Sequence, residues 1–156
     1  MSPPPLPVAR RVAVSDPILA GRAYDYADAI AVDLGPADDR APAAWVRDGL
    51  AATPAWVDRV VRLIGVQPAA DPAPGELDVF HVVSSDADAV HLEKSLPLLH
   101  VDLVGRNVAP GRRMLSTGLT YRRPALSRLV WAVLGPGHRW AARRVLVAPR
   151  TRATGA

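Results

Sequence analysis

The longest apolar pattern in the chain covers residues 124–148, near the C-terminus. Apolar residues recur there every three or four positions, which is typical of an amphipathic helix. Gly135-Pro136-Gly137 predicts a kink or a break, because proline lacks the N–H that the helix needs. The expected apolar face is Leu126, Leu129, Val130, Val133 and Leu134 with Trp131 beside it, and the helix continues through His138, Trp140, Ala141 and Val145. We expect this helix to be the central element of the fold.

Two shorter helices are predicted in the first half of the chain. The first covers residues 38–53, with Asp38 or Asp39 as its N-cap. Thr53 caps the second helix, which ends at Gly65. The apolar face expected for the second helix consists of Trp56, Val57, Val60, Val61 and Ile64.

Strands are predicted where apolar and polar residues alternate with a period of two. These segments are residues 23–34, 76–84, 89–96, 98–106 and 112–122. Short connections between the last four segments predict an antiparallel meander. One face of this sheet and one side of the C-terminal helix are apolar and are expected to bury each other.

The ends of the chain are predicted to lie outside the folded unit. Residues 1–22 begin with several prolines and show no period, which predicts an extended or poorly ordered arm. Residues 149–156 form a polar tail, so that a single domain is expected over residues 23–148. The chain contains no apolar run suited to a signal peptide or a transmembrane helix, and we expect a cytoplasmic protein.

Composition excludes some chemistry and adds one question about charge. The chain has no cysteine, which excludes disulfides, a thiol nucleophile and thiolate metal sites. Arginine outnumbers lysine 18 to 1, which indicates a GC-rich bacterial genome. Through Asp102, 15 acidic residues face 8 basic residues (net −7), whereas 11 arginines and no acidic residue follow (+11). Such asymmetry suggests an acidic partner, although arginines on a helix and in a tail are often simply solvated.

The order of strand, helix pair, meander and long C-terminal helix resembles the START/Bet v 1-like helix-grip superfamily, also called SRPBCC. Residues 26–34, 43–66 and 126–146 resemble more specifically an uncharacterised family of small bacterial proteins within it. In the last segment, Pro136 followed by His138 and Arg139 matches the proline and His-Arg of that family's last helix.

The resemblance covers about residues 24–148. It implies an α+β fold in which a curved antiparallel sheet wraps around a long kinked C-terminal helix, with a short helix pair after the first strand. A ligand cavity is implied between sheet and helix. The superfamily usually has six strands between the helix pair and the last helix, whereas four are predicted here. Either the sheet is reduced, which implies a smaller cavity, or the division into four strands is too coarse.

Four residues are candidates for lining such a cavity: Thr117 and Tyr121 in a strand, and Trp131 and His138 in the last helix. Alternate hydroxyls of a strand that face inward can orient a ligand in a mostly apolar pocket. The ordinary alternative is that Thr117 and Tyr121 reflect β-propensity, that Trp131 anchors its helix and that His138 packs on the core.

A second candidate group is the polar quartet His91, Glu93, His100 and Asp102. A two-residue hairpin loop at Leu96-Pro97 would place His91 opposite Asp102 and Glu93 opposite His100. Two histidines and two carboxylates suit a metal site or an acid–base pair. Because their neighbours in the strands form the better core, the quartet is instead expected as cross-strand ion pairs on the solvent side, and no metal or cofactor is predicted.

Three functions stay open at this point. The first is a domain that binds a small hydrophobic or amphipathic molecule between sheet and helix. The second is an enzyme on the same fold, such as a polyketide cyclase, dehydratase or hydrolase. No Gly-rich phosphate loop, nucleophile elbow or HExxH motif supports a particular reaction. The third is an interaction protein that uses the basic C-terminal third, although no nucleic-acid motif is present.

Overall fold

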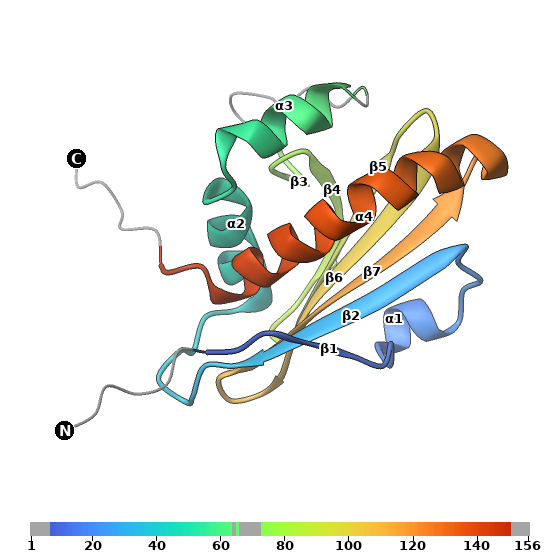
Figure 1. Ribbon diagram of the computed structural model, residues 1–156. Coiled ribbons are helices and arrows are strands. Elements are labelled where there is room, and N and C mark those ends of the chain that lie inside the picture. The colour runs from blue at the N-terminus through green and yellow to red at the C-terminus, as the bar shows by residue number, and fades with distance from the viewer. Residues whose placement is uncertain (1–6, 64, 66–72, 151–156) are drawn as a thin grey trace.

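A seven-stranded antiparallel sheet carries a long C-terminal helix across one face (Figure 1). The structure is a computed structural model that describes residues 7–63, 65 and 73–150. The elements in chain order are β1 (Arg10–Val12), α1 (Pro17–Ala20), β2 (Tyr26–Asp33), α2 (Pro42–Ala51), α3 (Ala55–Leu63), β3 (Glu76–Leu77), β4 (Phe80–Ser85), β5 (Ala89–Ser95), β6 (Leu99–Ala109), β7 (Arg112–Tyr121) and α4 (Pro124–Val147). The α+β architecture predicted from the sequence, with a curved antiparallel sheet and a long last helix, is confirmed.

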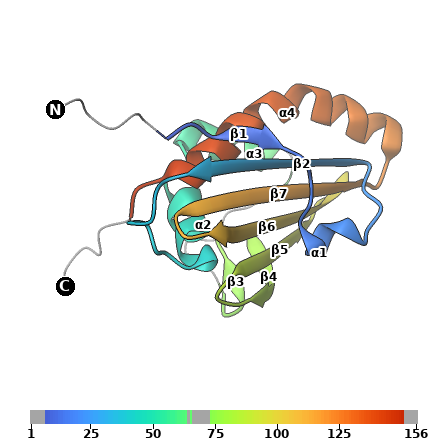
Figure 2. The same cartoon turned by 90° about the horizontal axis from the view of Figure 1, so that it is seen from below.

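The strands lie in the order β1-β2-β7-β6-β5-β4-β3, so that the first long strand pairs with the last (Figure 2). Strands β3 to β7 form the predicted meander, but the segment expected over residues 76–84 is divided into β3 and β4. Asp78 lies at this division with a φ of 56°, which a regular strand does not allow. Five strands therefore follow the helix pair in place of the four predicted.

The β5–β6 hairpin has a different register from the predicted one. Leu96 donates its backbone N–H to the carbonyl of Leu99, so the two-residue loop is Pro97-Leu98. Glu93 consequently lies opposite Asp102, and Ser95 lies opposite His100. The register predicted for the polar quartet was therefore wrong. The loop begins one residue later than expected, with Pro97 in its first position, and this moves the partner of Glu93 by two residues, from His100 to Asp102.

The main core lies between the sheet and the two helices α2 and α4. Trp45 and Val46 of α2 are fully buried against it. The other buried contributors include Ile30, Val32, Val90, Leu92, Leu103, Leu115, Val145 and Leu146. Helices α2 and α4 approach so closely that a Cβ on Gly49 would lie 2.6–2.7 Å from atoms of Val145. The predicted helix pair exists, but α2 begins at Pro42, and Ala41 occupies the N-cap position expected for Asp38 or Asp39.

Helix α4 buries a different side from the one predicted. The side that meets the sheet carries small residues, namely Ser127, Gly135 and Ala142, followed by Val145 and Leu146. Leu126, Leu129 and Val133 of the predicted apolar face are exposed. Small side chains let the helix axis approach the sheet, and a helix that is apolar on two sides does not reveal its buried side through periodicity alone. The helix is also continuous through Pro136, so that of the expected kink or break, the break does not occur.

The N-terminal segment, expected to be an extended or poorly ordered arm, is ordered over its described part. It forms β1 at the sheet edge and α1 on the face opposite α4 (Figures 1 and 2). Asp16 accepts a hydrogen bond from the N–H of Ile18 and caps α1, and it also pairs with Arg106. Leu19 is buried against the sheet. A capping aspartate before a proline was the sequence signal for this short helix.

Ion pairs join the acidic first part of the chain to its basic last third. Arg106 pairs with Asp16, Arg113 with Asp38, and Arg150 with Asp39. Part of the charge asymmetry along the sequence is therefore neutralised in the folded structure. Among the described residues, no helix is long and apolar enough to cross a membrane.

Acid titration is expected to report the pairing of Asp38. Hydrogen bonding to Arg40, assisted by the charge of Arg113, lowers the pKa of Asp38 to about 2. Because the folded pKa lies below the unfolded value of 3.8, the stability that Asp38 contributes is complete above that pH and is lost as the pH falls to about 2. Urea unfolding across this range should show a flatter pH dependence for Asp38→Asn than for the wild type.

The matched control for this titration is Asp58→Asn, at an exposed position on α3. Its free energy of unfolding should depend on pH between 4 and 2 as that of the wild type does, because Asp38 is unchanged and keeps its folded pKa of about 2. An Asp38→Asn profile as steep as the wild-type profile would contradict the prediction.

Candidate functional site

Four polar side chains meet between the sheet and α4, and we call them the inner polar site: Asp28, Thr117, Trp131 and His138. Asp28 of β2 and Thr117 of β7 are directly paired across the strands, so their side chains share the face that α4 covers. Trp131 and His138 lie seven residues apart, about two helical turns, and therefore on the same side of α4. Strand register and helix periodicity together produce the site.

Short distances connect three of the four residues, Asp28, Trp131 and His138, with one another and with Tyr26. The Tyr26 hydroxyl donates a hydrogen bond of 2.7 Å to Oδ2 of Asp28. Nε2 of His138 lies 3.7 Å from Oδ1 of Asp28, which is longer than a hydrogen bond. The Trp131 ring centroid is 5.1 Å from the Tyr26 ring and 5.1 Å from the His138 ring. Trp131 therefore lies between two groups that both reach the Asp28 carboxyl.

The charge of the site follows from these contacts. Burial alone would raise the pKa of Asp28, but the interactions with His138 and Tyr26 outweigh it, and the pKa lies below its usual value. Burial raises the pKa of Tyr26, and its hydrogen bond to Asp28 adds to this effect while Arg139 opposes it. At neutral pH the site thus contains a buried carboxylate beside a neutral phenol.

Each member of the inner polar site has a buried polar atom without a hydrogen-bond partner in the part of the chain that the structure describes. These atoms are Asp28 Oδ1, Thr117 Oγ1, Trp131 Nε1 and His138 Nε2. An unsatisfied buried donor or acceptor costs about 1–3 kcal/mol, and most proteins avoid it. All four atoms belong to residues on the facing surfaces of the sheet and α4, and two of them, Nε2 of His138 and Oδ1 of Asp28, lie 3.7 Å apart. A small polar group between these surfaces would offer the missing hydrogen bonds.

An apolar cluster adjoins the inner polar site. Leu96, Leu99 and Leu119 form its buried part. Half-buried residues packed against it are Tyr26, Val79, Val101, Tyr121 and Trp131. Because Tyr26 and Trp131 contact both groups, a polar end and an apolar end lie side by side beneath the first half of α4.

The sequence-derived cavity candidates are placed in two ways. Thr117, Trp131 and His138 come together in the inner polar site. Tyr121 packs instead against the adjoining apolar cluster of Leu96, Leu99 and Leu119. Sequence reasoning missed Asp28, although a signal was present: in the alternating strand it occupies the same face as Tyr26 and Ile30, where a carboxylate is unexpected.

The polar quartet lies on the opposite face of the sheet, and it is only partly exposed. His91 and Asp102 are 3% and 2% exposed, because the segment around α1 covers them. His91 Nε2 is 2.7 Å from Asp102 Oδ1, and Arg22 and Tyr24 donate to the same carboxylate at 3.1 and 3.2 Å. The expectation of a fully solvated quartet was therefore wrong for this buried pair. Asp102 instead attaches the N-terminal segment to the sheet.

Three atoms of the quartet lie close enough to hold a metal ion. Oxygen or nitrogen atoms of Glu93, His100 and Asp102 lie within 4.8 Å of one another, and Ser95 Oγ is 2.9 Å from Nδ1 of His100. However, the Arg22 guanidinium already contacts Asp102, and its positive charge opposes a second cation there. The arrangement is therefore better explained as a charge-balanced structural network.

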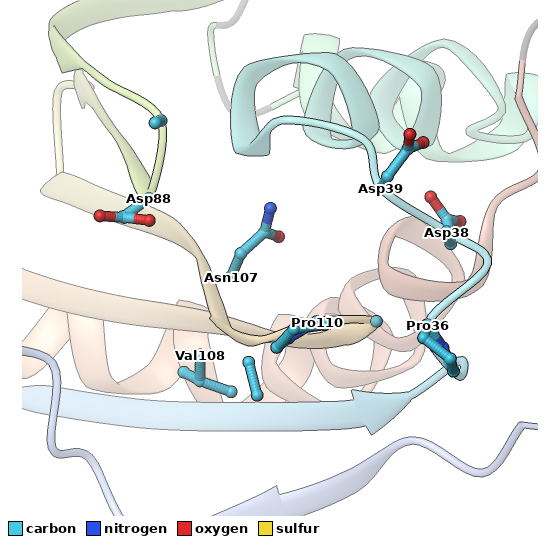
Figure 3. A pocket seen from close by; sticks show the side chains of 10 residues that line it. Pro36, Asp38, Asp39, Asp88, Asn107, Val108 and Pro110 are labelled. Carbon is cyan, nitrogen blue, oxygen red and sulfur yellow. The ribbon is translucent and has the colours of Figure 1, made fainter.

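A surface hollow of about 380 Å³ lies at one end of the sheet (Figure 3). Asp39 and Asp88 lie on opposite sides of Asn107 in this hollow. Asn107 accepts a hydrogen bond from Trp45 and donates one to the Arg40 carbonyl, and Asp38 and Asp39 pair with arginines. Most of its polar groups therefore already have partners within the protein, unlike those of the inner polar site.

The fold and the site together define the class of this protein: an α+β domain, compatible with the helix-grip fold, with buried polar groups between its sheet and its last helix. Comparison of the chain with known protein families, curated proteins and solved structures returns no match. The functional argument therefore depends on the residues of this chain.

Proposed function

We propose that this domain binds a small amphipathic molecule between the sheet and α4. The single observation that carries the proposal is the group of four buried polar atoms, at Asp28, Thr117, Trp131 and His138, that have no hydrogen-bond partner among the described residues. A ligand with a hydroxyl or a similar group that both donates and accepts would satisfy them. Its apolar part would lie along the cluster of Leu96, Leu99 and Leu119.

The resemblance to the START/Bet v 1-like superfamily supports the same location. Ligands of that fold lie between the curved sheet and the C-terminal helix, and the inner polar site occupies this position in the chain. We propose that the protein is a distant member of the superfamily with a reduced sheet. This assignment rests on the order of elements and on the quoted segments, and it is independent of the unpaired atoms.

Entry of a ligand requires a movement of α4, because the four polar atoms are closed to solvent. Gly135-Pro136-Gly137 lies between Trp131 and His138 in the sequence of this helix. Pro136 lacks the N–H that would bond to the preceding turn, and glycine lowers helix stability. The helix is thus weakest at the point where the site would have to open.

The test is native mass spectrometry of the freshly purified full chain, compared with its denatured mass. A discrete additional mass that is lost on denaturation is the expected result, and fragmentation would identify the molecule. If the native mass is that of the chain alone, titration with the amphipathic fluorophore anilinonaphthalene sulfonate follows. Absence of both an occupant and saturable probe binding would overturn the proposal.

The variant Thr117→Val separates ligand binding from simple packing. Valine has nearly the same shape but lacks the unpartnered hydroxyl, so the ligand-free protein should gain up to about 1–3 kcal/mol of unfolding free energy. Binding of the occupant, or of the probe, should weaken because one anchoring group is lost. Thermal unfolding and fluorescence titration measure the two effects.

Ser116→Ala is the matched control for this variant. Ser116 is the neighbouring residue, its buried hydroxyl also lacks a partner among the described residues, and it points to the other face of the sheet. It should gain stability in the same way without any change in binding. Equal binding by the wild type and by Thr117→Val would mean that the hydroxyl at position 117 does not contact a ligand.

Catalysis is a second candidate function, favoured by one observation. Tyr26, Asp28 and His138 are titratable side chains that lie close together and face inward. An acid–base mechanism between sheet and helix requires such a group, and the polar quartet, on the other face of the sheet, does not provide it. Incubation of the ligand-free protein with the identified occupant, followed by mass spectrometry, would detect turnover. Loss of turnover but not of binding in His138→Gln would support an enzyme, and an unchanged occupant would exclude it for that molecule.

A further inference from the structure

The side of α4 that faces away from the sheet carries a line of exposed apolar side chains, which we call the outer stripe. Its members and their exposed fractions are Leu126 (44%), Leu129 (63%), Val133 (73%), Trp140 (38%) and Val147 (37%). Their spacing of three, four or seven residues keeps them on one side of the helix. A large exposed apolar surface of this kind marks an interaction site.

Exposed arginines accompany the outer stripe. Arg122 and Arg123 precede the helix, Arg128 lies in its first half, and Arg143 and Arg144 lie near its end. The Arg144 guanidinium lies 4.7 Å above the Trp140 ring. Helix α4 contains no acidic residue. The outer face of α4 is therefore apolar, with exposed positive charges near both ends of the helix.

Helix α3 extends this surface. It lies beside α4 in Figure 1, and the rings of Trp56 and Trp140 are 5.4 Å apart. Trp56 and Leu63 are also exposed, at 49% and 86%. Arg59 and Arg62 are exposed on the same short helix. Of the apolar face predicted for α3, Trp56 is exposed and contacts the outer stripe at Trp140, and Val57 and Val60 are half-buried, whereas the side chains of Val61 and Ile64 lie outside the described part of the structure.

We infer that the outer stripe, with Trp56 and Leu63, binds the surface of an anionic phospholipid bilayer. A helix with an apolar side, flanking arginines and tryptophan lies in the interface of such a membrane, with its apolar side chains among the acyl chains and its cations at the headgroups. This surface lies on the far side of α4 from the inner polar site. The inference therefore stands independently of the proposed ligand.

Charge decides between this partner and two others. A second copy of the chain would bring two basic helices together, with no acidic residue on α4 to compensate either one. A nucleic acid would satisfy the arginines but would leave exposed leucine, valine and tryptophan in contact with phosphates. An anionic membrane is the partner that satisfies the charged and the apolar side chains together.

Co-sedimentation of the full chain with vesicles tests this inference. Vesicles of phosphatidylcholine alone are compared with vesicles of equal parts phosphatidylcholine and phosphatidylglycerol, at low and at high salt. We expect binding only to the anionic vesicles and weaker binding at high salt. Leu129→Gln/Val133→Gln should weaken binding about tenfold or more, and Arg143→Gln/Arg144→Gln should weaken it about 10- to 30-fold.

Val108→Gln is the matched control, because Val108 is similarly exposed (43%) but lies on the β6–β7 hairpin. It should leave vesicle binding unchanged, and circular dichroism should show that all variants are folded.

Three outcomes would overturn the inference: no binding of the wild type to anionic vesicles, full binding by Leu129→Gln/Val133→Gln, or an equal loss with Val108→Gln. Retention on heparin without vesicle binding would assign the basic face to nucleic acid, and dimerisation abolished by Leu129→Gln/Val133→Gln would assign the stripe to a second copy.

Discussion

Replacing Asp102 with alanine is expected to lower the free energy of unfolding by at least about 1–3 kcal/mol, because removal of the carboxylate leaves the buried His91 ring without its hydrogen-bond partner. The carboxylate is 2% exposed and lies 2.7 Å from His91, which is itself 3% exposed. Arg22 and Tyr24 would lose the same acceptor. Urea unfolding at neutral pH measures the loss.

A second measurement on Asp102→Ala reports where the stability is lost. Arg22 and Tyr24 belong to the segment that connects α1 to β2, so this segment should lose its attachment to the sheet. Hydrogen exchange of residues 16–25 should increase more than that of β6 itself. Uniform acceleration over the whole sheet would contradict this local role.

Glu93→Gln is the matched control for Asp102→Ala. Glu93 lies directly opposite Asp102 in the hairpin, but its carboxylate is 39% exposed and 3.9 Å from His100. Partly exposed ion pairs contribute about 0–1 kcal/mol, so this variant should stay within that range. Similar losses in the two variants would mean that the quartet acts as one unit, as a metal site would require.

Substitution of Gly49 with alanine is the second large effect that we expect. The added Cβ would lie 2.6 Å from a side-chain carbon of Val145 and 2.7 Å from its backbone Cα and carbonyl oxygen. Backbone atoms cannot rotate away, so α2 and α4 would have to separate. Overpacking of a core costs about 1–3 kcal/mol and occasionally more, and we expect a loss at or above the upper end of this range in thermal unfolding.

Gly137→Ala, in α4, is expected to change the free energy of unfolding in the opposite direction to Gly49→Ala. No atom lies within 4 Å of a Cβ added at Gly137, and its backbone has no positive φ. Alanine should therefore stabilise α4 by up to about 1 kcal/mol through helix propensity alone. Destabilisation by Gly137→Ala would contradict this prediction, and an unchanged stability of Gly49→Ala would contradict the explanation based on contact with Val145.

These variants separate two uses of buried polar groups in one small sheet. On the outer face, Asp102 is surrounded by donors, and its polar atoms have partners. On the inner face, one oxygen of Asp28 accepts a hydrogen bond from Tyr26, while the other faces Nε2 of His138 at 3.7 Å, which is longer than a hydrogen bond. The first arrangement is typical of structural stabilisation. In the second arrangement a ligand could form hydrogen bonds that the protein itself does not form, which supports the choice of the inner polar site.

Prediction of the candidate site from the sequence was partial for a definite reason. Thr117, Trp131 and His138 were found because hydroxyl, aromatic and imidazole groups stand out in a strand and in the last helix. Asp28 was missed, although a carboxylate on the apolar face of a strand is a readable signal. The contact between Asp28 and Thr117, which are 89 positions apart in the chain, depends on the pairing of β2 with β7.

The sequence by itself determined the types of the main elements. Strands β5 and β7 were predicted nearly to the residue, because alternation with a period of two is a local property. The length and apolar content of residues 124–148 determined a long last helix in the same way. The α+β class and the antiparallel meander followed from the order of these elements and from their short connections.

Only the tertiary structure decided which surfaces meet. It placed small residues of α4 on the sheet and left Leu129 and Val133 exposed, because a helix with two apolar sides can be turned either way by what it packs against. The β5–β6 register differs from the predicted one because the loop begins at Pro97. The segment around α1 is ordered because Arg22 and Tyr24 bind Asp102. These outcomes depend on contacts between residues far apart in the chain, whereas the helices and strands themselves arise from neighbours, and local patterns carry information about neighbours alone.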